Sequence, residues 1–215
     1  MEFIVLLAIL FFSTSFYMFL TSYRFQIFWR KTKTKKVLID AILPRVKGKY
    51  MAEGHFASSH KVLSKYEYNK LRHSGKLNFS RCYNVITFKT KDSDWEMFFY
   101  LVKEGMKFNE VLAIRAFPRE VKIKSQATIE KTKDRVNVLA NNKYLAQILE
   151  SYESKELLRW MLNKEGDNFF VYNNNIFYKS IQHGNEIIAV DRALEIIKAA
   201  HNLKNRIYKK GILEY

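Results

Sequence analysis

An uninterrupted uncharged run at the N-terminus constrains this chain more than any other feature. Residues 3–23 read FIVLLAILFFSTSFYMFLTSY, 21 residues without a charge. As an α-helix the run is about 30 Å long, which matches the thickness of a bilayer core. It lacks the basic leader and the small-residue cleavage site of a signal peptide. The sequence therefore predicts a retained transmembrane anchor over residues 1–23.

The cations that flank this run predict its orientation. None precedes the run, whereas six follow it closely: Arg24, Arg30, Lys31, Lys33, Lys35 and Lys36. Because cationic flanks stay on the cytoplasmic side, we expect a single-pass protein of the inner membrane, with its N-terminus outside and its C-terminal domain in the cytoplasm. The single cysteine, Cys82, agrees with a reducing compartment because it cannot form an intrachain disulfide.

The same six cations are the candidate contacts with anionic lipid. Residues 23–49 hold nine Lys and Arg against one acid, Asp40, so positive charge is concentrated beside the predicted anchor. Cations close to an anionic leaflet each contribute about 1 kcal/mol of attraction. The alternative is that the segment only marks topology. The simple KTKTKK pattern favours this alternative because it indicates no shaped lipid pocket.

Positive charge elsewhere raises the question of nucleic-acid binding. Residues 50–215 hold 28 Lys and Arg against 19 Asp and Glu. Lys122 and Lys124 alternate in one segment, as do Lys131, Lys133 and Arg135 in another, but a solvated strand face explains this spacing equally well. The sequence contains no zinc-finger spacing, basic zipper or RNA-binding signature. It therefore favours the lipid bilayer and a protein partner over nucleic acid.

The remainder of the chain divides into a basic connector at 24–47 and a cytoplasmic domain at 48–215. In the connector, apolar residues at helical spacing predict a helix that Pro44 should end. In the domain, period-two runs rich in Val, Ile, Phe and Tyr predict strands at 50–56, 82–90, 94–102, 111–117, 121–124 and 135–139. Ser64 is a candidate cap for a short helix at 64–72.

The second half of the domain has helical patterns on either side of a hairpin. Residues 141–152 place four apolar side chains on one helical face: Leu145, Ile148, Leu149 and Tyr152. Ser154 is the predicted cap of a second helix, and residues 168–181 predict a hairpin around three asparagines. Without regular βαβ alternation, the order of elements predicts an α+β fold with a mainly antiparallel sheet and packed helices after the transmembrane helix.

A final helix is predicted from Asn185 to about residue 210. Its apolar stripe consists of Ile187, Val190, Leu194, Ile197 and Leu203. Three cations, Arg192, Lys198 and Lys204, are expected on the opposite or flanking face. We expect this helix to pack across the sheet. Consecutive apolar runs such as 98–100 and 169–172 predict strands buried on both faces, by the protein's own elements rather than by a partner.

The stretch DRVNVLANNKYLAQILESYESKELLRWMLNKEGDNFFVYNNNIFYKSI combines a strand, paired helices and a hairpin, and a long helix follows it. This pattern, over about a third of the chain, resembles the C-terminal half of a class of bacterial single-pass membrane-anchored domain proteins whose function is not assigned. The class has no known catalytic residues. The resemblance therefore implies an architecture and no chemistry.

The residues whose side chains could act in catalysis or bind a metal do not form a recognisable motif. The five histidines are His55, His60, His73, His183 and His201. The spacing of His55 and His60 suits neither a strand face nor a helix face for shared metal ligation. Cys82 has no base beside it in sequence, and no phosphate-binding loop or nucleophile elbow is present. The sequence thus predicts no catalytic, cofactor or metal site.

Anchor, basic connector and domain together favour a non-enzymatic interaction or assembly subunit of a membrane-associated complex. Two alternatives remain open. One is a membrane-tethered enzyme whose site forms only in three dimensions, and the other is a module that binds anionic lipid or nucleic acid. An enzyme should show a cleft where histidines and carboxylates converge, whereas a polyanion binder should show a contiguous basic face.

Overall fold

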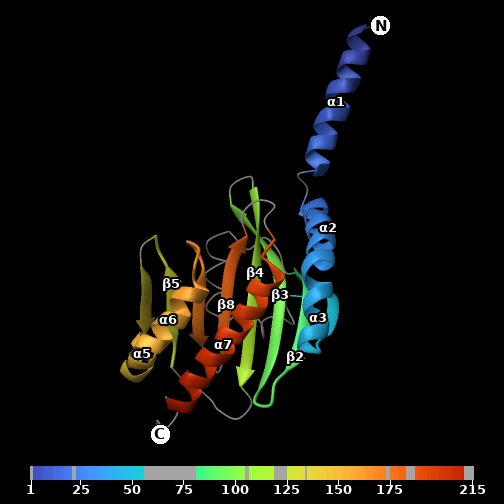
Figure 1. Cartoon of the computed structure of the whole chain (residues 1–215). Helices are drawn as coiled ribbons and strands as arrows, with labels where there is room; N and C mark the ends of the chain where they lie inside the picture. The colour runs from blue at the N-terminus through green and yellow to red at the C-terminus, as the bar shows by residue number, and fades with distance from the viewer. Residues whose placement is uncertain are drawn as a thin grey trace.

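The computed structural model describes residues 2–20, 23–55, 81–104, 107–118, 125–133, 135–172, 175–182 and 187–210. These residues confirm the predicted α+β class with an antiparallel sheet on which helices pack (Figure 1). Eight described strands form one sheet in the order β1-β2-β3-β4-β8-β7-β5-β6. Every neighbouring pair is antiparallel. β1 and β6 are therefore the two edges.

The strands agree with most of the period-two runs. Their bounds are β1 (Lys49–His55), β2 (Arg81–Lys89), β3 (Ser93–Glu104), β4 (Lys107–Pro118), β5 (Ala127–Lys131), β6 (Val136–Ala140), β7 (Asn168–Tyr172) and β8 (Asn175–Gln182). β7 and β8 form the predicted hairpin. β5 is a strand that the sequence pattern does not predict. The strand expected at 121–124 and the helix expected at 64–72 lie outside the described residues.

The sheet is apolar on both faces, which explains the consecutive aromatic residues. Phe99 and Phe169 belong to the larger core on the face that the helices cover. Their neighbours Phe98 and Phe170 belong to a second buried cluster, in which no described helix takes part. Because successive side chains of a strand point to opposite faces, each run supplies both cores. The predicted burial of these runs is confirmed.

The helices of the second half cover the larger core. They are α5 (Lys143–Glu150), α6 (Tyr152–Met161) and α7 (Val190–Lys210), seen in front of the sheet in Figure 1. α5 begins where the Asn142 side chain accepts hydrogen bonds from the backbone N–H groups of Tyr144 and Leu145. The prediction for Tyr152 was wrong, since this side chain is 78% exposed. Ser154 does not cap α6, because that helix begins earlier and buries Ser154.

α7 packs on the sheet as expected, but its buried stripe is rotated from the predicted one. The fully or nearly fully buried apolar residues are Ala193, Ile196, Ala199, Ala200, Leu203 and Ile207. Leu203 is the one predicted stripe residue at the centre of this face. Val190, Leu194 and Ile197 flank it and are only partly buried. The prediction for Lys204 was wrong, because this lysine is 1% exposed.

The N-terminal part is a helical arm that ends against the sheet. It comprises α1 (Glu2–Leu20), α2 (Tyr23–Thr34), the π-helix η1 (Lys35–Ile39) and α3 (Asp40–Val46). Leu38, Ile39 and Ile42 are fully buried in the larger core. Pro44 lies inside α3 instead of ending it. Core contacts made by the buried residues offset the hydrogen bond that a proline cannot donate.

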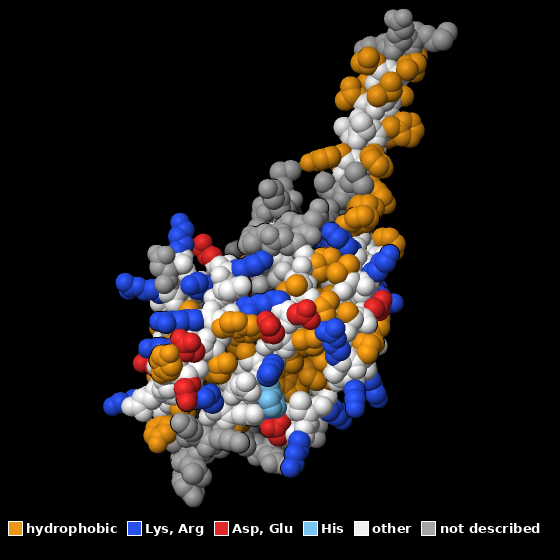
Figure 2. Space-filling model, viewed as in Figure 1, with side chains coloured by type: hydrophobic (Ala, Val, Ile, Leu, Met, Phe, Trp, Pro, Cys, Tyr) orange, Lys and Arg blue, Asp and Glu red, His pale blue; other side chains and the backbone are white. Residues whose placement is uncertain are grey.

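α1 projects away from the sheet in Figure 1. Its apolar side chains are exposed along the helix, and Figure 2 shows those on one face in orange. Examples are Ile4, Leu7 and Phe12, which are each more than half exposed. Within the part of the chain that the structure describes, no helix combines the length and apolar character needed to cross a membrane.

Candidate functional site

A buried carboxylate lies where the N-terminal arm meets the sheet. Glu110 of β4 is 2% exposed. The hydroxyl of Tyr83, on β2, donates to Glu110 Oε1 at 2.5 Å. The hydroxyl of Thr34, the last residue of α2, donates to the same oxygen at 3.3 Å. Three elements far apart in sequence are thus joined through one side chain, and we call Thr34, Tyr83 and Glu110 the arm junction.

A second polar contact holds the backbone of the arm. Asn84 is fully buried, and its amide nitrogen donates to the carbonyl of Lys31 at 2.8 Å. Its amide oxygen accepts from the hydroxyl of Tyr50 at 2.9 Å. Asn84 has φ of 50°, and the pairing of β2 with β3 shifts register at this point. Asparagine tolerates this left-handed conformation better than most residues, so the bulge can aim its amide at α2.

The environment of Glu110 shifts its ionisation. Burial raises the pKa of this carboxyl, while the Tyr83 hydrogen bond and the charge of Arg30 oppose the rise. Thr34 and Lys33 oppose it more weakly. The positive charges of Arg30 and Lys33, two of the candidate lipid contacts, therefore favour the ionised form of a carboxyl inside the domain. A buried carboxylate with hydrogen-bond donors and nearby cations is a suitable device for fixing a helix to a sheet.

The six candidate lipid contacts do not form one face. The side chain of Arg24 lies outside the described residues, and Arg30, Lys31 and Lys33 are partly buried. Lys35 and Lys36 are exposed, and the Lys35 ammonium lies 5.3 Å from the centre of the Tyr50 ring. Glu110 was not among the predicted site residues. The sequence feature that could have identified Glu110 is the alternation of side chains along the strand. This alternation puts Glu110 on the same face as the core residues Leu112 and Ile114.

Replacing Glu110 with glutamine is expected to change how stability depends on pH. The folded-state pKa is raised above its ordinary value of 4.5, so the folded protein holds this proton more tightly than the unfolded chain does. The resulting stabilisation is complete below pH 4.5 and is lost as pH rises through the raised folded-state value. Glutamine cannot ionise. The stability of Glu110→Gln relative to wild type should therefore increase with pH in urea unfolding measurements.

The exposed Glu150 provides the matched control, since Glu150→Gln removes a carboxylate that is not buried. Its stability relative to wild type should change little over the same pH range. A constant difference between Glu110→Gln and wild type from acid to neutral pH would contradict the assignment of Glu110 as a carboxyl with a raised pKa.

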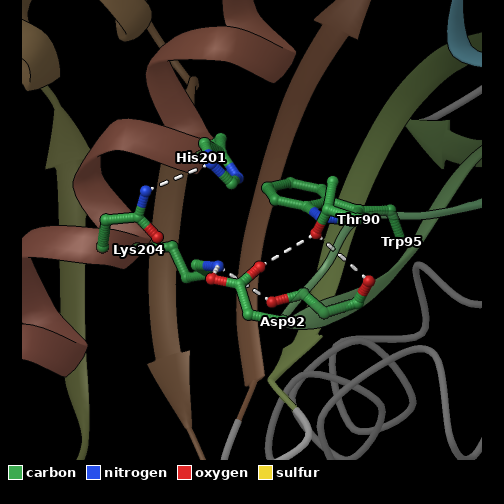
Figure 3. A network of polar contacts seen from close by, with 7 residues as sticks. Thr90, Asp92, Trp95, His201 and Lys204 are labelled. Atoms are coloured by element: carbon green, nitrogen blue, oxygen red, sulfur yellow. Dashed lines mark hydrogen bonds and ion pairs between the residues drawn. The ribbon is translucent and has the colours of Figure 1, made fainter.

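A second polar network joins α7 to the turn between β2 and β3 (Figure 3). The ammonium of Lys204 donates to Asp92 Oδ2 at 2.5 Å and to Ser93 Oγ at 2.9 Å. Thr90 donates to the other oxygen of Asp92 and accepts from the indole N–H of Trp95. This network closes the end of the sheet over the core. It holds a buried cation by one carboxylate and one hydroxyl.

The charges in this network shift each other's ionisation. Burial opposes ionisation of Asp92, but hydrogen bonds from Lys204 and Thr90 outweigh it and lower the pKa of Asp92 to about 2. Burial lowers the pKa of His201, and the charge of Lys204 lowers it further. The His201 ring lies against Trp95, with ring centres 5.9 Å apart. Burial and ion pairing account for both pKa shifts.

A small pocket of about 280 Å³ lies between β8 and the beginning of α7. Tyr178, Ser180 and Gln182 line it from β8, and Arg192 lines it from α7. Behind it, burial raises the pKa of Asp167, and a hydrogen bond from Ser180 opposes the rise. No carboxylate, histidine or cysteine among the described residues lines the pocket itself. It offers polar contacts but no acid–base pair.

Most of the remaining chemical candidates lie outside the described residues. Cys82 is a buried thiol of the smaller core. His60, His73 and His183 lie outside the described residues, as does the side chain of His55. Within the described ranges, no three histidine, cysteine, aspartate or glutamate side chains are grouped closely enough to hold a metal ion.

Comparison with known proteins gives no relative from which a role could be transferred. No protein-family model, curated protein or solved structure matches the chain. The resemblance to bacterial membrane-anchored domain proteins therefore stays a prediction. The functional argument rests on the geometry of the arm and the surfaces of the domain.

Proposed function

We propose that this protein is a membrane-attached, non-enzymatic interaction or assembly subunit. In this proposal the uncharged N-terminal segment enters the inner membrane and the α+β domain presents a binding surface in the cytoplasm. The observation that carries the proposal is the exposure of α1, whose large apolar side chains from Ile4 to Phe19 are each more than half exposed (Figure 2). Exposed apolar surfaces of this size are typical of contacts with lipid or with another protein.

The arm junction supports this role because it makes the arm part of the folded domain. α2 is held by the Thr34–Glu110 contact and by the bond from Asn84 to the Lys31 carbonyl. The next turns place Leu38 and Ile39 in the core. A domain attached in this way has a defined orientation relative to α2. Such an orientation suits a subunit that must present one surface to a partner in the same membrane complex.

The length of α2 favours the interpretation that Lys35 and Lys36, which follow it, set the membrane topology and do not contact lipid. α2 continues away from α1 alongside the domain in Figure 1. At about 1.5 Å per residue, Lys35 lies roughly 18 Å along the helix from Tyr23, which is more than a Debye length at physiological salt. Lys35 and Lys36 would therefore gain little from a leaflet that ends near Tyr23. Arg24, one residue after Tyr23, is the cation best placed to contact headgroups.

Membrane attachment is tested by placing charge in α1. The wild-type chain should stay with the membrane pellet after alkaline carbonate extraction, whereas a Leu6→Arg, Leu10→Arg double variant should move to the supernatant. Each arginine near the centre of an inserted helix costs about 2.5–3.5 kcal/mol. Both leucines are exposed, so the changes leave the domain core intact.

The control for this extraction is Tyr152→Arg, which places one arginine at an exposed position of α6. That variant should fractionate as wild type does. Complete release of the wild-type chain by carbonate, or identical behaviour of the double variant and wild type, would exclude membrane insertion.

Orientation is tested separately. A reporter fused after Tyr215 should be active in its cytoplasmic form, because all six flanking cations follow the uncharged run. Activity only in the form that requires export would reverse the proposed topology. It would also place Cys82 in an oxidising compartment.

A further inference from the structure

Among the described strands, β6 pairs on one side only and leaves the other side of its backbone without a neighbouring strand. It pairs with β5 and is the last strand in the order of the sheet. At its two ends, the Arg135 carbonyl accepts from the Thr132 N–H, and the Asn141 N–H donates to the Gln126 carbonyl. Antiparallel ladders alternate between residues that bond inward and residues that point outward. The backbone groups of Val136, Val138 and Ala140 therefore point away from β5.

A basic groove borders this edge on the face that carries the helices. Its volume is about 540 Å³, and Val136 and Val138 form part of its floor. Four cations line it, from three parts of the fold: Lys131 of β5, Arg135 before β6, and Lys155 and Arg159 of α6. Figure 2 shows Lys and Arg side chains gathered over this side of the molecule. The alternating cations Lys131 and Arg135 of the sequence thus belong to a groove rather than to a plain strand face.

Among the residues that the structure describes, no acidic side chain lines this groove. Within the described ranges, none of the four cationic side chains forms an ion pair with a described acidic side chain. Lysine on an edge strand is a common protection against aggregation. That explanation does not cover Lys155 and Arg159, which come from α6 and converge on the same groove.

We propose that the β6 edge binds an extended acidic segment of a partner protein as an added antiparallel strand. The inference deepens the proposed role as an interaction subunit and rests on it. Residues of the added strand that pair with Val136 and Val138 share their face, so their side chains enter the basic groove. The residues between them lie on the opposite face, where Leu139 is 69% exposed. The segment that fits is one in which acidic and apolar residues alternate.

The floor of the groove favours a peptide over a nucleic acid. Single-stranded nucleic acids bind through aromatic platforms together with cations. No aromatic side chain of the described residues lines this groove. Valine side chains and outward-pointing backbone groups are what strand addition uses, with affinity from the main chain and specificity from alternate side chains.

The test measures binding of a fluorescent peptide of alternating glutamate and valine to the full chain in mild detergent. Wild type should bind it, and the double variant Lys155→Glu, Arg159→Glu should bind at least about tenfold more weakly because two attractions become repulsions. Lys198→Glu, an exposed cation of α7, is the matched control and should leave binding unchanged. A peptide with glutamates and valines in separate blocks should bind weakly to wild type.

Backbone methylation of the probe tests strand addition without altering the protein. In the proposed register the glutamates donate their N–H groups to β6, so N-methyl-glutamate should abolish binding and N-methyl-valine should not. The reverse result, or binding that is insensitive to both, would overturn the proposal. Equal binding of polyglutamate or single-stranded RNA would also overturn it, in favour of a general polyanion site. Absence of peptide binding would refute the edge proposal, whereas carbonate extraction alone decides membrane attachment.

Discussion

Asp92→Asn is expected to lower the free energy of unfolding by about 3 kcal/mol, because it leaves a buried ammonium without its counter-charge. The side chain of Lys204 is 2% exposed, whereas that of Asp92 is 47% exposed. The two sides of this ion pair are therefore unequal. Asp92 can return to water when its partner is removed, but Lys204 cannot. Ser93 still accepts one hydrogen bond from the ammonium, and it carries no charge to replace the carboxylate.

The control for Asp92→Asn is the same substitution at Asp191. Asp191 pairs with Arg45 at 3.2 Å, and both side chains are more than half exposed. Exposed pairs contribute less than about 1 kcal/mol, so Asp191→Asn should have a small effect. Urea unfolding of both variants at neutral pH measures the contrast. Equal and small losses would mean that Lys204 does not depend on Asp92 in the folded state.

Acid pH provides a second measurement of the same pair. The folded-state pKa of Asp92 is depressed from 3.8 to about 2. Its contribution to stability is therefore present above pH 3.8 and is lost as pH falls through about 2. The difference in stability between wild type and Asp92→Asn should shrink over that interval. A difference that grows toward acid pH would contradict the sign of the shift.

The parts of the fold that could be predicted are those with a local signal. Side-chain alternation places Ile86 and Phe88 on one face of β2. Two apolar runs around three asparagines identify the hairpin of β7 and β8. β5 escaped prediction because its five residues are too few for a clear period, and only Ala127 and Ile129 point into the larger core. The prediction that the connector helix ends at Pro44 was wrong. Burial of Ile42 in the core stabilises the helix and outweighs the local tendency of proline to end it.

The candidate sites depend on pairs that no local pattern contains. Lys204 and Asp92 are 112 residues apart, and Thr34 and Glu110 are 76 residues apart. A lone lysine on a helix is normally assigned to the solvent face because an unpaired buried cation is costly. Only the folded topology brings a carboxylate to it. The cations of the β6 groove come together in the same way, through the approach of α6 to the edge of the sheet.

The largest loss of stability is expected from Ile196→Ala in α7. Ile196 is 1% exposed and packs in the larger core. Removing its side chain forfeits transfer free energy and leaves a cavity, with a typical cost of about 2–5 kcal/mol. That cost is a large fraction of the stability of an ordinary domain.

Leu194→Ala is the decisive comparison, because the helical stripe read from sequence is centred on Leu194 rather than on Ile196. In the structure Leu194 is only partly buried at the flank of the stripe, so its truncation should cost clearly less. Lys198→Ala, at an exposed position, should cost least. Denaturant unfolding of the three variants therefore ranks the faces of α7. A loss for Leu194→Ala equal to or above that for Ile196→Ala would mean that α7 is rotated toward the stripe predicted from sequence. That rotation would also turn Lys204 away from Asp92, so the same ranking independently tests the buried ion pair.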